Sequence, residues 1–381
     1  MLTVLLLSAA TICACGGGNG STTTTTPPPT AQQAAKPTIA TAPAQNGAMI
    51  VTLADGTNGA KIYYTLDGSA PKETSQIYQA PFLVASNLTV NAMAANPPAY
   101  ADSAVATQAF TPNIGSGTLI WSDEFSASGN SNSQPNANVW TYDVGTNCCG
   151  NNELETYCAW GSTAGPCNPS NPNAYLGTDG YLHVMAQNPS AGVYTSARLK
   201  SQGLFSFMYG RIEARMKLPE SQGMWPAFWL LGNNIATIGW PACGELDIME
   251  HINGSNPAPY VGGPLPGYDW IAGSVHGGTS ASEANGTQQY HPNGFSAADW
   301  HTYGMIWTKG QIQFYVDSPT NVYATFKSTD SAWTSSPWPF DAGPQFIILN
   351  LAVGGDWPGS PDKTTVFPSD MSVDYVRIYS N

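Results

Sequence analysis

The sequence predicts an all-β protein with two folded units, a small β-sandwich followed by a large antiparallel sandwich. Short apolar runs of β-type composition recur along most of the chain, and turn-forming residues separate them, including 39 Gly and 30 Pro. No segment longer than about ten residues shows a helical period of 3.6. All twelve Trp lie between Trp121 and Trp357, so the composition also divides the chain into two parts.

The N-terminal segment has the features of an export signal. The stretch from Leu2 to Ala14 is apolar, but it is shorter than the roughly 20 residues that span a bilayer. The small residue before Cys15 makes residues 1–15 similar to a bacterial lipoprotein signal, and an ordinary cleaved signal peptide is the alternative. Residues 16–35 are rich in Gly, Thr and Pro, which predicts a disordered linker. We therefore expect an outer-membrane lipoprotein or a secreted protein, in contact with the membrane only through an N-terminal lipid anchor.

Residues 36–112 predict the small β-sandwich. Turn signals such as Asp67-Gly68 separate β-type runs at the spacing of a small sandwich. These runs are Met49–Leu53, Lys61–Leu66, Phe82–Val84, Leu88–Ala94 and Ala104–Phe110. The sequence AKIYYTLDGSAP, which begins at Ala60, resembles the Ig-like module at the C-terminal end of chitobiases, a module attached to many secreted carbohydrate-active enzymes. We expect it to act as a spacer, with carbohydrate binding as the alternative.

Residues 118–381 predict the large sandwich. Val373–Tyr379 alternates apolar and polar residues over most of its length, as a half-buried strand does. Other expected strands are Tyr181–Ala186, Tyr209–Leu218, Met224–Leu231, Gly244–Glu250, Trp300–Thr308, Gln311–Val316 and Gln345–Leu351. One large antiparallel sandwich accounts for a segment of this length and pattern.

The charge composition limits the classes of partner. Only 10% of the residues are charged and the net charge is −13, whereas an average soluble domain has about 25% charged residues. Because few basic residues are available to bind phosphates, nucleic acid and anionic membrane surfaces are excluded as partners.

Three carboxylates fall within six residues, at Glu245, Asp247 and Glu250, in a chain where carboxylates are scarce. On a helix, Glu245 and Asp247 would point about 200° apart, whereas on a strand they share one face. Glu250 would then point to the opposite face, unless a β-bulge at Ile248-Met249 returns it to the first. A bulged strand with all three carboxylates on one face is therefore predicted, and a regular strand whose Glu250 points away is the alternative.

On a bulged strand, these carboxylates suit the hydrolysis of glycosidic bonds. Two carboxyl groups about 5–5.5 Å apart are the arrangement of retaining glycosidases, in which one attacks the anomeric carbon and the other protonates the leaving oxygen. Asp247 between them would hold Glu245 in position and separate the pKa values of the two glutamates. The alternative is a solvated or ion-paired acidic strand.

The segment GELDIME, from Gly244 to Glu250, resembles the active-site strand of glycoside hydrolase family 16. Other motifs match the laminarinase-like (β-1,3-glucanase) branch of that family: WSDEF from Trp121, NNEL from Asn151, YGRIEAR from Tyr209, GMWPAFWLL from Gly223 and NLAVGG from Asn350. The resemblance implies a curved, concanavalin-like β-jelly-roll with an open cleft, and hydrolysis with net retention. It assigns Glu245 as the nucleophile, Asp247 as the assisting carboxylate and Glu250 as the acid/base.

Further residues are expected to bind the sugar chain. Indole rings stack on the apolar faces of sugar rings, and Trp225, Trp229 and Trp240 flank the catalytic strand in sequence. The resemblance adds four polar residues for substrate binding, which are Arg198, His276, Asn152 and Glu153. The alternatives are a core position for the Trp side chains and a structural ion pair for Arg198.

The resemblance implies no cofactor for catalysis, but it does imply a structural calcium on the convex side of the jelly-roll. Glu124 and Asp374 match the positions that would supply carboxylate ligands to this ion.

The cysteines agree with export. Cys158 and Cys167 are the easiest pair for a local disulfide, and Cys148 or Cys149 is a candidate for another bond in the same loop. Cys243, directly before the catalytic strand, is expected to be a buried free thiol.

Together these features predict a monomeric, secreted or surface-anchored endo-β-1,3-glucanase that acts on laminarin-like β-glucan polysaccharide. A β-1,3-1,4-glucanase or another family-16 hydrolase is the first alternative, because His276-Gly277-Gly278-Thr279 differs from the loop usual in the family. A non-catalytic glycan-binding protein is the second, and the presence of all three carboxylates argues against it.

Overall fold

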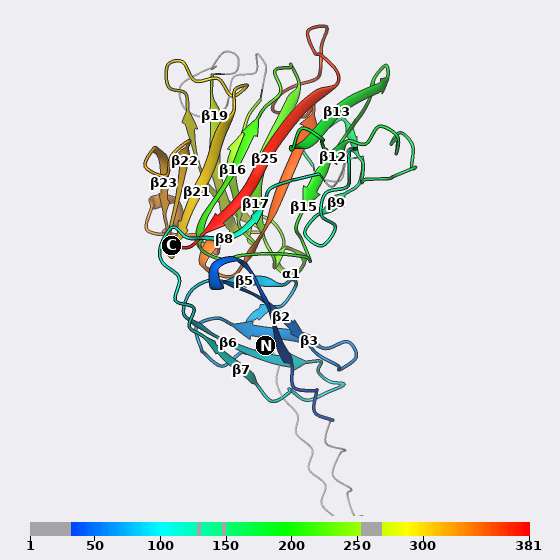
Figure 1. Cartoon of the computed structure of the whole chain (residues 1–381). Helices are drawn as coiled ribbons and strands as arrows, with labels where there is room; N and C mark the ends of the chain where they lie inside the picture. Colours follow the sequence, from blue (N-terminus) through cyan, green and yellow to red (C-terminus); the bar gives the residue numbers. More distant parts are fainter. Residues whose placement is uncertain (1–31, 128–130, 147–149, 253–268) are drawn as a thin grey trace, which may run out of the picture.

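The computed structural model describes residues 32–127, 131–146, 150–252 and 269–381, and the fold is nearly all β, as predicted (Figure 1). The expected signal segment 1–15 and most of the linker 16–35 lie outside the described residues. The helices of the described part are α1 (Ile235–Ile238) and the 3-10 helices η1 (Gln45–Gly47), η2 (Ser331–Trp333) and η3 (Pro339–Asp341). None of these helices could cross a membrane, because each is too short.

The small sandwich consists of two antiparallel sheets with the strand orders β1-β2-β5 and β4-β3-β6-β7. Their strands are β1 (Thr38–Pro43), β2 (Met49–Ala54), β3 (Lys61–Thr65), β4 (Gln76–Ile77), β5 (Phe82–Val84), β6 (Leu88–Ala95) and β7 (Ala106–Phe110). Val51, Phe82, Val90 and Ala106 from the two sheets share one buried core. Strands β1 and β4 were not predicted, because β1 has mostly exposed side chains and β4 has only two residues.

The large sandwich has an outer sheet of eleven strands. Nine of them follow the order β10-β11-β14-β13-β25-β16-β21-β22-β23, while β12 pairs with β13 and β8 pairs with β25. These strands are β8 (Leu119–Asp123), β10 (Gly145–Thr146), β11 (Glu155–Tyr157), β12 (Ala174–Leu176), β13 (Leu182–Ser190), β14 (Val193–Ser196), β16 (Gly210–Lys217), β21 (His301–Thr308), β22 (Gln311–Val316), β23 (Val322–Lys327) and β25 (Ser369–Tyr379). Only the short pair β11–β14 is parallel among the described strands of this sheet.

The inner sheet has seven antiparallel strands in the order β20-β19-β18-β17-β24-β15-β9. These strands are β9 (Thr141–Asp143), β15 (Arg198–Lys200), β17 (Met224–Gly232), β18 (Glu245–Glu250), β19 (Ile271–Thr279), β20 (Ser282–Tyr290) and β24 (Gln345–Val353). Strand β18, which carries the three carboxylates, lies between two neighbours near the middle of the sheet.

The two large sheets share one continuous core. Phe228, Leu246 and Ile248 of the inner sheet and Met305 and Val376 of the outer sheet are buried in it. The burial of each such side chain adds about 1.5–3 kcal/mol to the free energy of unfolding. This layer therefore holds the inner sheet firmly against the outer one and leaves the other face of the inner sheet for function.

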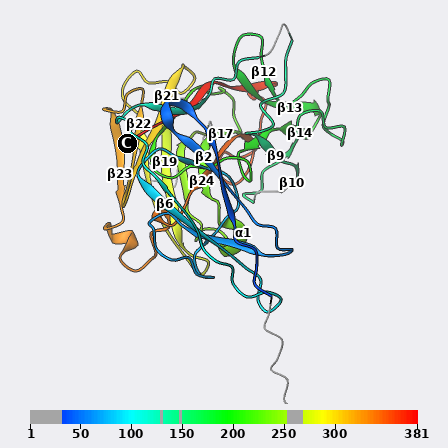
Figure 2. The same ribbon diagram turned by 60° about the horizontal axis from the view of Figure 1, so that its bottom comes forward.

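The small sandwich packs directly on one end of the large one, beside β8 (Figure 1). In the view turned by 60°, its strands lie in front of the end of the large sheets (Figure 2). The Leu83 N–H donates to the Ser206 carbonyl at 3.0 Å, and the Ser206 hydroxyl donates to the Pro81 carbonyl at 2.9 Å. Ala48 and Leu83 belong to the core of the large sandwich. The expected spacer is therefore in specific contact with the unit that it precedes.

Candidate active site

The face of the inner sheet that points away from the core forms a cleft of about 910 Å³. The side chains of a strand alternate between its two faces. Phe228 of β17 is accordingly buried in the core, while every second side chain around it lines the cleft: Trp225, Ala227, Trp229 and Leu231.

Strand β18 contains the predicted β-bulge. Trp229 on β17 pairs with Asp247, whereas the preceding residue, Phe228, pairs with Met249, so that Ile248 is the extra residue. Ile248 and Met249 are consecutive, and yet both are buried in the core. The alternation is therefore restored beyond the bulge. The carboxylates that line the cleft are Glu245, Asp247 and Glu250.

Each of the two glutamates accepts a hydrogen bond from an indole. Trp225 Nε1–H donates to Glu250 Oε1 at 3.0 Å, and Trp240 Nε1–H donates to Glu245 Oε2 at 3.1 Å. Trp225 packs edge-on against Trp357 at 5.4 Å between ring centroids, and Trp240 is 48% exposed. Two of the three predicted Trp side chains thus combine a place in the cleft with a donor to a carboxylate.

The environment raises the pKa of both glutamates. Burial, and then the charge of Asp247, raise the pKa of Glu250 to about 8. Burial and then the charge of Asp247 also raise the pKa of Glu245 well above its ordinary value. His276 and Arg198 oppose this rise at Glu245, because a nearby positive charge favours the ionised carboxylate. Because its pKa is about 8, Glu250 keeps its proton at neutral pH.

His276 lines the cleft and also lies beside Asp247. Its Nε2 is 3.2 Å from Asp247 Oδ2, and its Nδ1 is 2.6 Å from Glu283 Oε1. Burial disfavours the charged ring, but Asp247, Glu245 and Glu283 outweigh this and raise the pKa of His276 to about 10. The predicted sugar-binding histidine is therefore also a charged neighbour of the catalytic strand.

Arg198 and Trp229 lie together on the floor of the cleft. Arg198 Nε is 3.1 Å from Asp143 Oδ2, and its guanidinium lies 4.5 Å from the centre of the Trp229 ring. Trp229 is only 9% exposed, and its Nε1–H donates to Asn350 Oδ1 at 2.7 Å. Both residues therefore line the cleft and also make structural contacts.

Glu153 lines the cleft, but Asn152 is not among the lining residues. The Tyr157 hydroxyl donates to Glu153 Oε2 at 3.0 Å. The Asn152 side chain donates instead to the Asp356 carboxylate, at 2.9 and 3.0 Å from its two oxygens. Asn152 therefore holds Asp356, a cleft residue, in place, and its contact with sugar stays a prediction.

Several cleft residues were not predicted from the sequence. The polar and aromatic ones are Asp143, Asn151, Ser274, Glu283, Asn285, Asn350, Asp356 and Trp357. Asn350 could have been identified, because it is the one polar residue within the apolar run FIILNLAV of β24 and it begins one of the motifs that match the family. Glu283 and Asn285 could not, because their strand, SEANGTQQY, has no hydrophobic period that marks one face.

The residues expected to bind calcium do not fit this ion. Glu124 accepts two hydrogen bonds from Arg377, at 3.0 and 2.8 Å, and Asp374 accepts one from Arg215 at 2.7 Å. A guanidinium therefore stands where the cation would bind each carboxylate. Within the described ranges, one group of three side chains has potential ligand atoms within 4.8 Å of one another. This group is Glu245, Asp247 and His276, and the charged histidine already serves as its cation.

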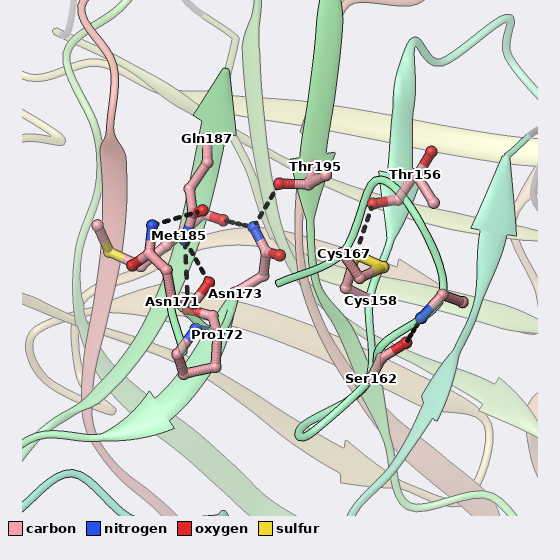
Figure 3. Close-up of a disulfide and its surroundings, with 11 residues drawn as sticks. Thr156, Cys158, Ser162, Cys167, Asn171, Pro172, Asn173, Met185, Gln187 and Thr195 are labelled. Atoms are coloured by element: carbon pink, nitrogen blue, oxygen red, sulfur yellow. Dashed lines mark hydrogen bonds between the residues drawn. A yellow bond between two sulfur atoms is a disulfide. The ribbon is translucent and has the colours of Figure 1, made fainter. Parts of the chain in front are cut away.

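The predicted disulfide between Cys158 and Cys167 is present, with Cα atoms 5.7 Å apart (Figure 3). It closes a loop between β11 and β12. In Figure 3, Asn173 lies beside this loop, and its amide donates to the Met185 carbonyl at 2.8 Å and to the Thr195 hydroxyl at 3.0 Å. The disulfide and these hydrogen bonds together tie the loop to the outer sheet.

Cys243 is a buried free thiol, as predicted. Burial raises its pKa to about 12, so it is not a nucleophile at neutral pH. Cys148 and Cys149 lie outside the described residues.

Comparisons with known proteins agree with this site. Residues 162–377 match the family described as Glycosyl hydrolases family 16, and residues 51–110 match the one described as Fn3 associated. The beta-glucanase of Rhodothermus marinus is 38% identical over 273 residues, which cover 68% of this chain and 84% of that protein. The keratan-sulfate endo-1,4-beta-galactosidase of Sphingobacterium multivorum is 34% identical, over 68% of this chain and 54% of that protein.

A solved structure extends the likeness to the fold. The laminarinase catalytic domain from Thermotoga maritima matches with a TM-score of 0.56 and 33% identity, over 70% of this chain and 99% of that domain. This match confirms the jelly-roll expected for the large sandwich. The family match covers more than half of the chain, and the chain is therefore a glycoside hydrolase that belongs to family 16.

Proposed function

We propose that this chain is a retaining endo-β-1,3-glucanase that hydrolyses laminarin-like β-glucan. The observation that carries the proposal is strand β18, whose bulge puts three carboxylates on the floor of a cleft, with an indole donor on each glutamate. The relatives named beta-glucanase and laminarinase support this substrate class.

In the proposed mechanism, Glu245 is the nucleophile. Its carboxylate attacks the anomeric carbon, and a covalent glycosyl-enzyme forms as the bond to the leaving oxygen breaks. A nucleophile must be ionised. Burial and the charge of Asp247 raise the pKa of Glu245 and oppose that form, whereas three neighbours favour it. They are the positive charges of His276 and Arg198 and the indole donor of Trp240.

Glu250 is the acid/base. It is protonated at neutral pH, so it can give its proton to the leaving oxygen in the first step. As a carboxylate, it then takes a proton from the water molecule that attacks the glycosyl-enzyme. Asp247 assists by holding the His276 ring at 3.2 Å, next to the nucleophile.

Sugar rings are proposed to bind against the Trp225 and Trp240 rings, which line the cleft beside the two glutamates. Flat indole faces suit the apolar faces of glucose units. Arg198 and Glu153 lie on the same cleft surface and offer a donor and an acceptor to sugar hydroxyls.

The substrate is tested by reducing-sugar release from laminarin, curdlan, lichenan, agarose and keratan sulfate, with NMR of the first anomer formed. We expect the highest rate on laminarin and an initial β-anomer. The highest rate on lichenan, agarose or keratan sulfate would refute the β-1,3-glucan assignment, and an initial α-anomer would refute retention.

The two glutamate roles are tested with Glu245→Ala and Glu250→Ala, each of which should lower kcat by about four orders of magnitude or more. Azide distinguishes them on an aryl β-glucoside oligomer. With Glu245→Ala, azide takes the place of the carboxylate and gives an α-glycosyl azide. With Glu250→Ala, azide attacks the glycosyl-enzyme and gives a β-glycosyl azide.

A matched control is Glu73→Gln, at an exposed site in the small sandwich, which should keep full activity. The opposite azide product from either variant would reverse the two assignments, and near-normal turnover would remove that residue from its role.

We also propose that the protein is exported and anchored through a lipid on Cys15, as residues 1–15 indicate. In a bacterial host, Cys15→Ser should move the protein from the membrane fraction to the soluble fraction. An unchanged distribution would refute the anchor.

A further inference from the structure

His276 lies between two carboxylates that come from the strands on either side of its own. Nε2 is 3.2 Å from Asp247 on β18, and Nδ1 is 2.6 Å from Glu283 on β20. A ring nitrogen that faces an ionised carboxylate must donate a proton, and only the imidazolium form donates from both nitrogens. The geometry therefore favours a charged His276 whose ring is held at both ends.

Glu283 is itself held in place. Asn285 Nδ2–H donates to Glu283 Oε1 at 2.8 Å, the same oxygen that His276 contacts. In the register of β19 and β20, Asn285 lies opposite His276, and Glu283 lies opposite Gly278. Gly278 has a φ of +102°, and a Cβ there would meet the Ser282 carbonyl oxygen at 2.5 Å. Only glycine allows this tight end of the hairpin, which fixes Glu283 diagonally across from His276.

Exposure increases in order along this series of side chains. Asp247 is 5% exposed, His276 is 16% exposed and Glu283 is 32% exposed. The charged groups that face the ring are Glu245 and Asp247 from β18 and Glu283 from β20. The series thus connects a carboxylate at the cleft rim with a buried carboxylate of the catalytic strand.

We propose that Glu283 is a positioning residue of the active site, which holds the His276 ring charged and oriented toward Asp247 and the nucleophile. The inference rests on the proposed role of Glu245, because the charge of His276 favours the ionised form of that carboxylate. Glu283 touches neither substrate nor reacting atoms in this role and acts only through His276.

The first test is the titration of the His276 ring by NMR in the full-length protein, with His276→Gln to assign its signals among the five histidines. Glu283→Gln removes the charge and keeps the shape. The midpoint should fall by about one pH unit or more, because a carboxylate in contact shifts its partner's pKa by about one to three units. Glu73→Gln removes the same charge from an exposed site in the small sandwich and should not move it. An unchanged midpoint in Glu283→Gln overturns the proposal.

The second test is the pH profile of kcat on laminarin. The deficit of Glu283→Gln relative to the wild type should grow about twofold or more from about pH 6 to about pH 9, because a His276 ring whose pKa falls from about 10 to about 9 is half deprotonated at pH 9, while the wild-type ring stays mostly charged. Glu283→Asp keeps the charge and should recover most of the loss. A deficit that is equal at every pH, or no recovery by Asp, would contradict the proposal.

The two tests separate this inference from the proposed function. The titration needs no substrate, so it reports on the contact between Glu283 and His276 even in a protein without glucanase activity. An active wild type whose His276 midpoint ignores Glu283→Gln refutes the role of Glu283 alone. A wild type inactive on all the polysaccharides refutes the proposed function and, with it, the positioning role.

Discussion

At the scale of single residues, the site depends on two tryptophans that each hold one glutamate. Trp225 donates to Glu250 and Trp240 donates to Glu245. A donor to a carboxylate favours its ionised form, and yet burial raises the pKa of both glutamates. The indoles therefore limit a shift that burial would otherwise carry further, and each one acts on a different catalytic group.

Replacing each indole should move a different limb of the pH profile. Trp225→Phe removes the donor to Glu250 and raises its pKa. The acid then keeps its proton to a higher pH, and the alkaline limb of the kcat profile moves to higher pH. Trp240→Phe raises the pKa of Glu245. The nucleophile then ionises only at a higher pH, and the acid limb of the profile also moves to higher pH. One hydrogen bond corresponds to about 0.5–1 pH unit.

Initial rates on laminarin across the pH range measure both shifts, and each variant is the control for the other because both keep an aromatic ring in the cleft. If both variants moved the same limb, the assignment of acid and nucleophile to Glu250 and Glu245 would be wrong.

At the scale of elements, the bulge of the catalytic strand follows from the spacing of its glutamates once they are required to share a face. Glu245 and Glu250 are an odd number of residues apart, so a shared face requires one extra residue between them. The strand that supports His276 could not be predicted in this way. Strand β20 has exposed or half-buried side chains nearly throughout, and its Glu283 is defined only by the register with β19. Register depends on the folded sheet and leaves no local pattern in such a strand.

A second pair of carboxylates is formed by Glu155, at the start of β11, and Glu153, two residues before it. Glu155 is 2% exposed and Glu153 is 9% exposed, and the Val353 N–H donates to Glu155 Oε2 at 2.7 Å. Burial, and then the charge of Glu153, raise the pKa of Glu155 to about 8. Glu155 is therefore neutral at pH 7 and can share its proton with Glu153.

This pair predicts a pH-dependent gain in stability from Glu155→Gln. The unfolded carboxyl loses its proton near pH 4.5, while the folded one keeps it to about pH 8. A folded pKa above the unfolded one means that the stability of the wild type falls as pH rises through this window. The amide introduced by Glu155→Gln does not titrate, so it can donate to Glu153 at every pH and avoids this loss of stability.

Thermal unfolding should therefore give the Glu155→Gln variant a Tm about 2–4 °C above the wild type at about pH 8, and the same Tm at about pH 4. A variant less stable than the wild type at the higher pH would show that Glu155 is needed as a charged group.

At the scale of the whole molecule, the two folded units were predictable, but their contact was not. Leu83 has the pattern of an ordinary strand residue, and Ala48 lies directly before β2, and yet both are buried in the core of the large sandwich. Alternation reveals which side of a strand is apolar, but not which body will cover it. The contact is also incomplete, because a cavity of about 720 Å³ remains between residues such as Gln76 and Asp341.

The contact predicts that the two units unfold together. Val51 is fully buried in the core of the small sandwich. Val51→Ala should therefore lower the free energy of unfolding of that unit by about 2 kcal/mol. All twelve Trp belong to the large unit, so tryptophan fluorescence follows the large sandwich alone. If strand β5 and Ser206 couple the two units, Val51→Ala should lower the midpoint of the fluorescence transition by about 4 °C.

Lys72→Ala, at an exposed site of the same sandwich, should not move this midpoint. A fluorescence midpoint that ignores Val51→Ala, while circular dichroism shows the small unit melting earlier, would mean that the small sandwich is an independent spacer after all.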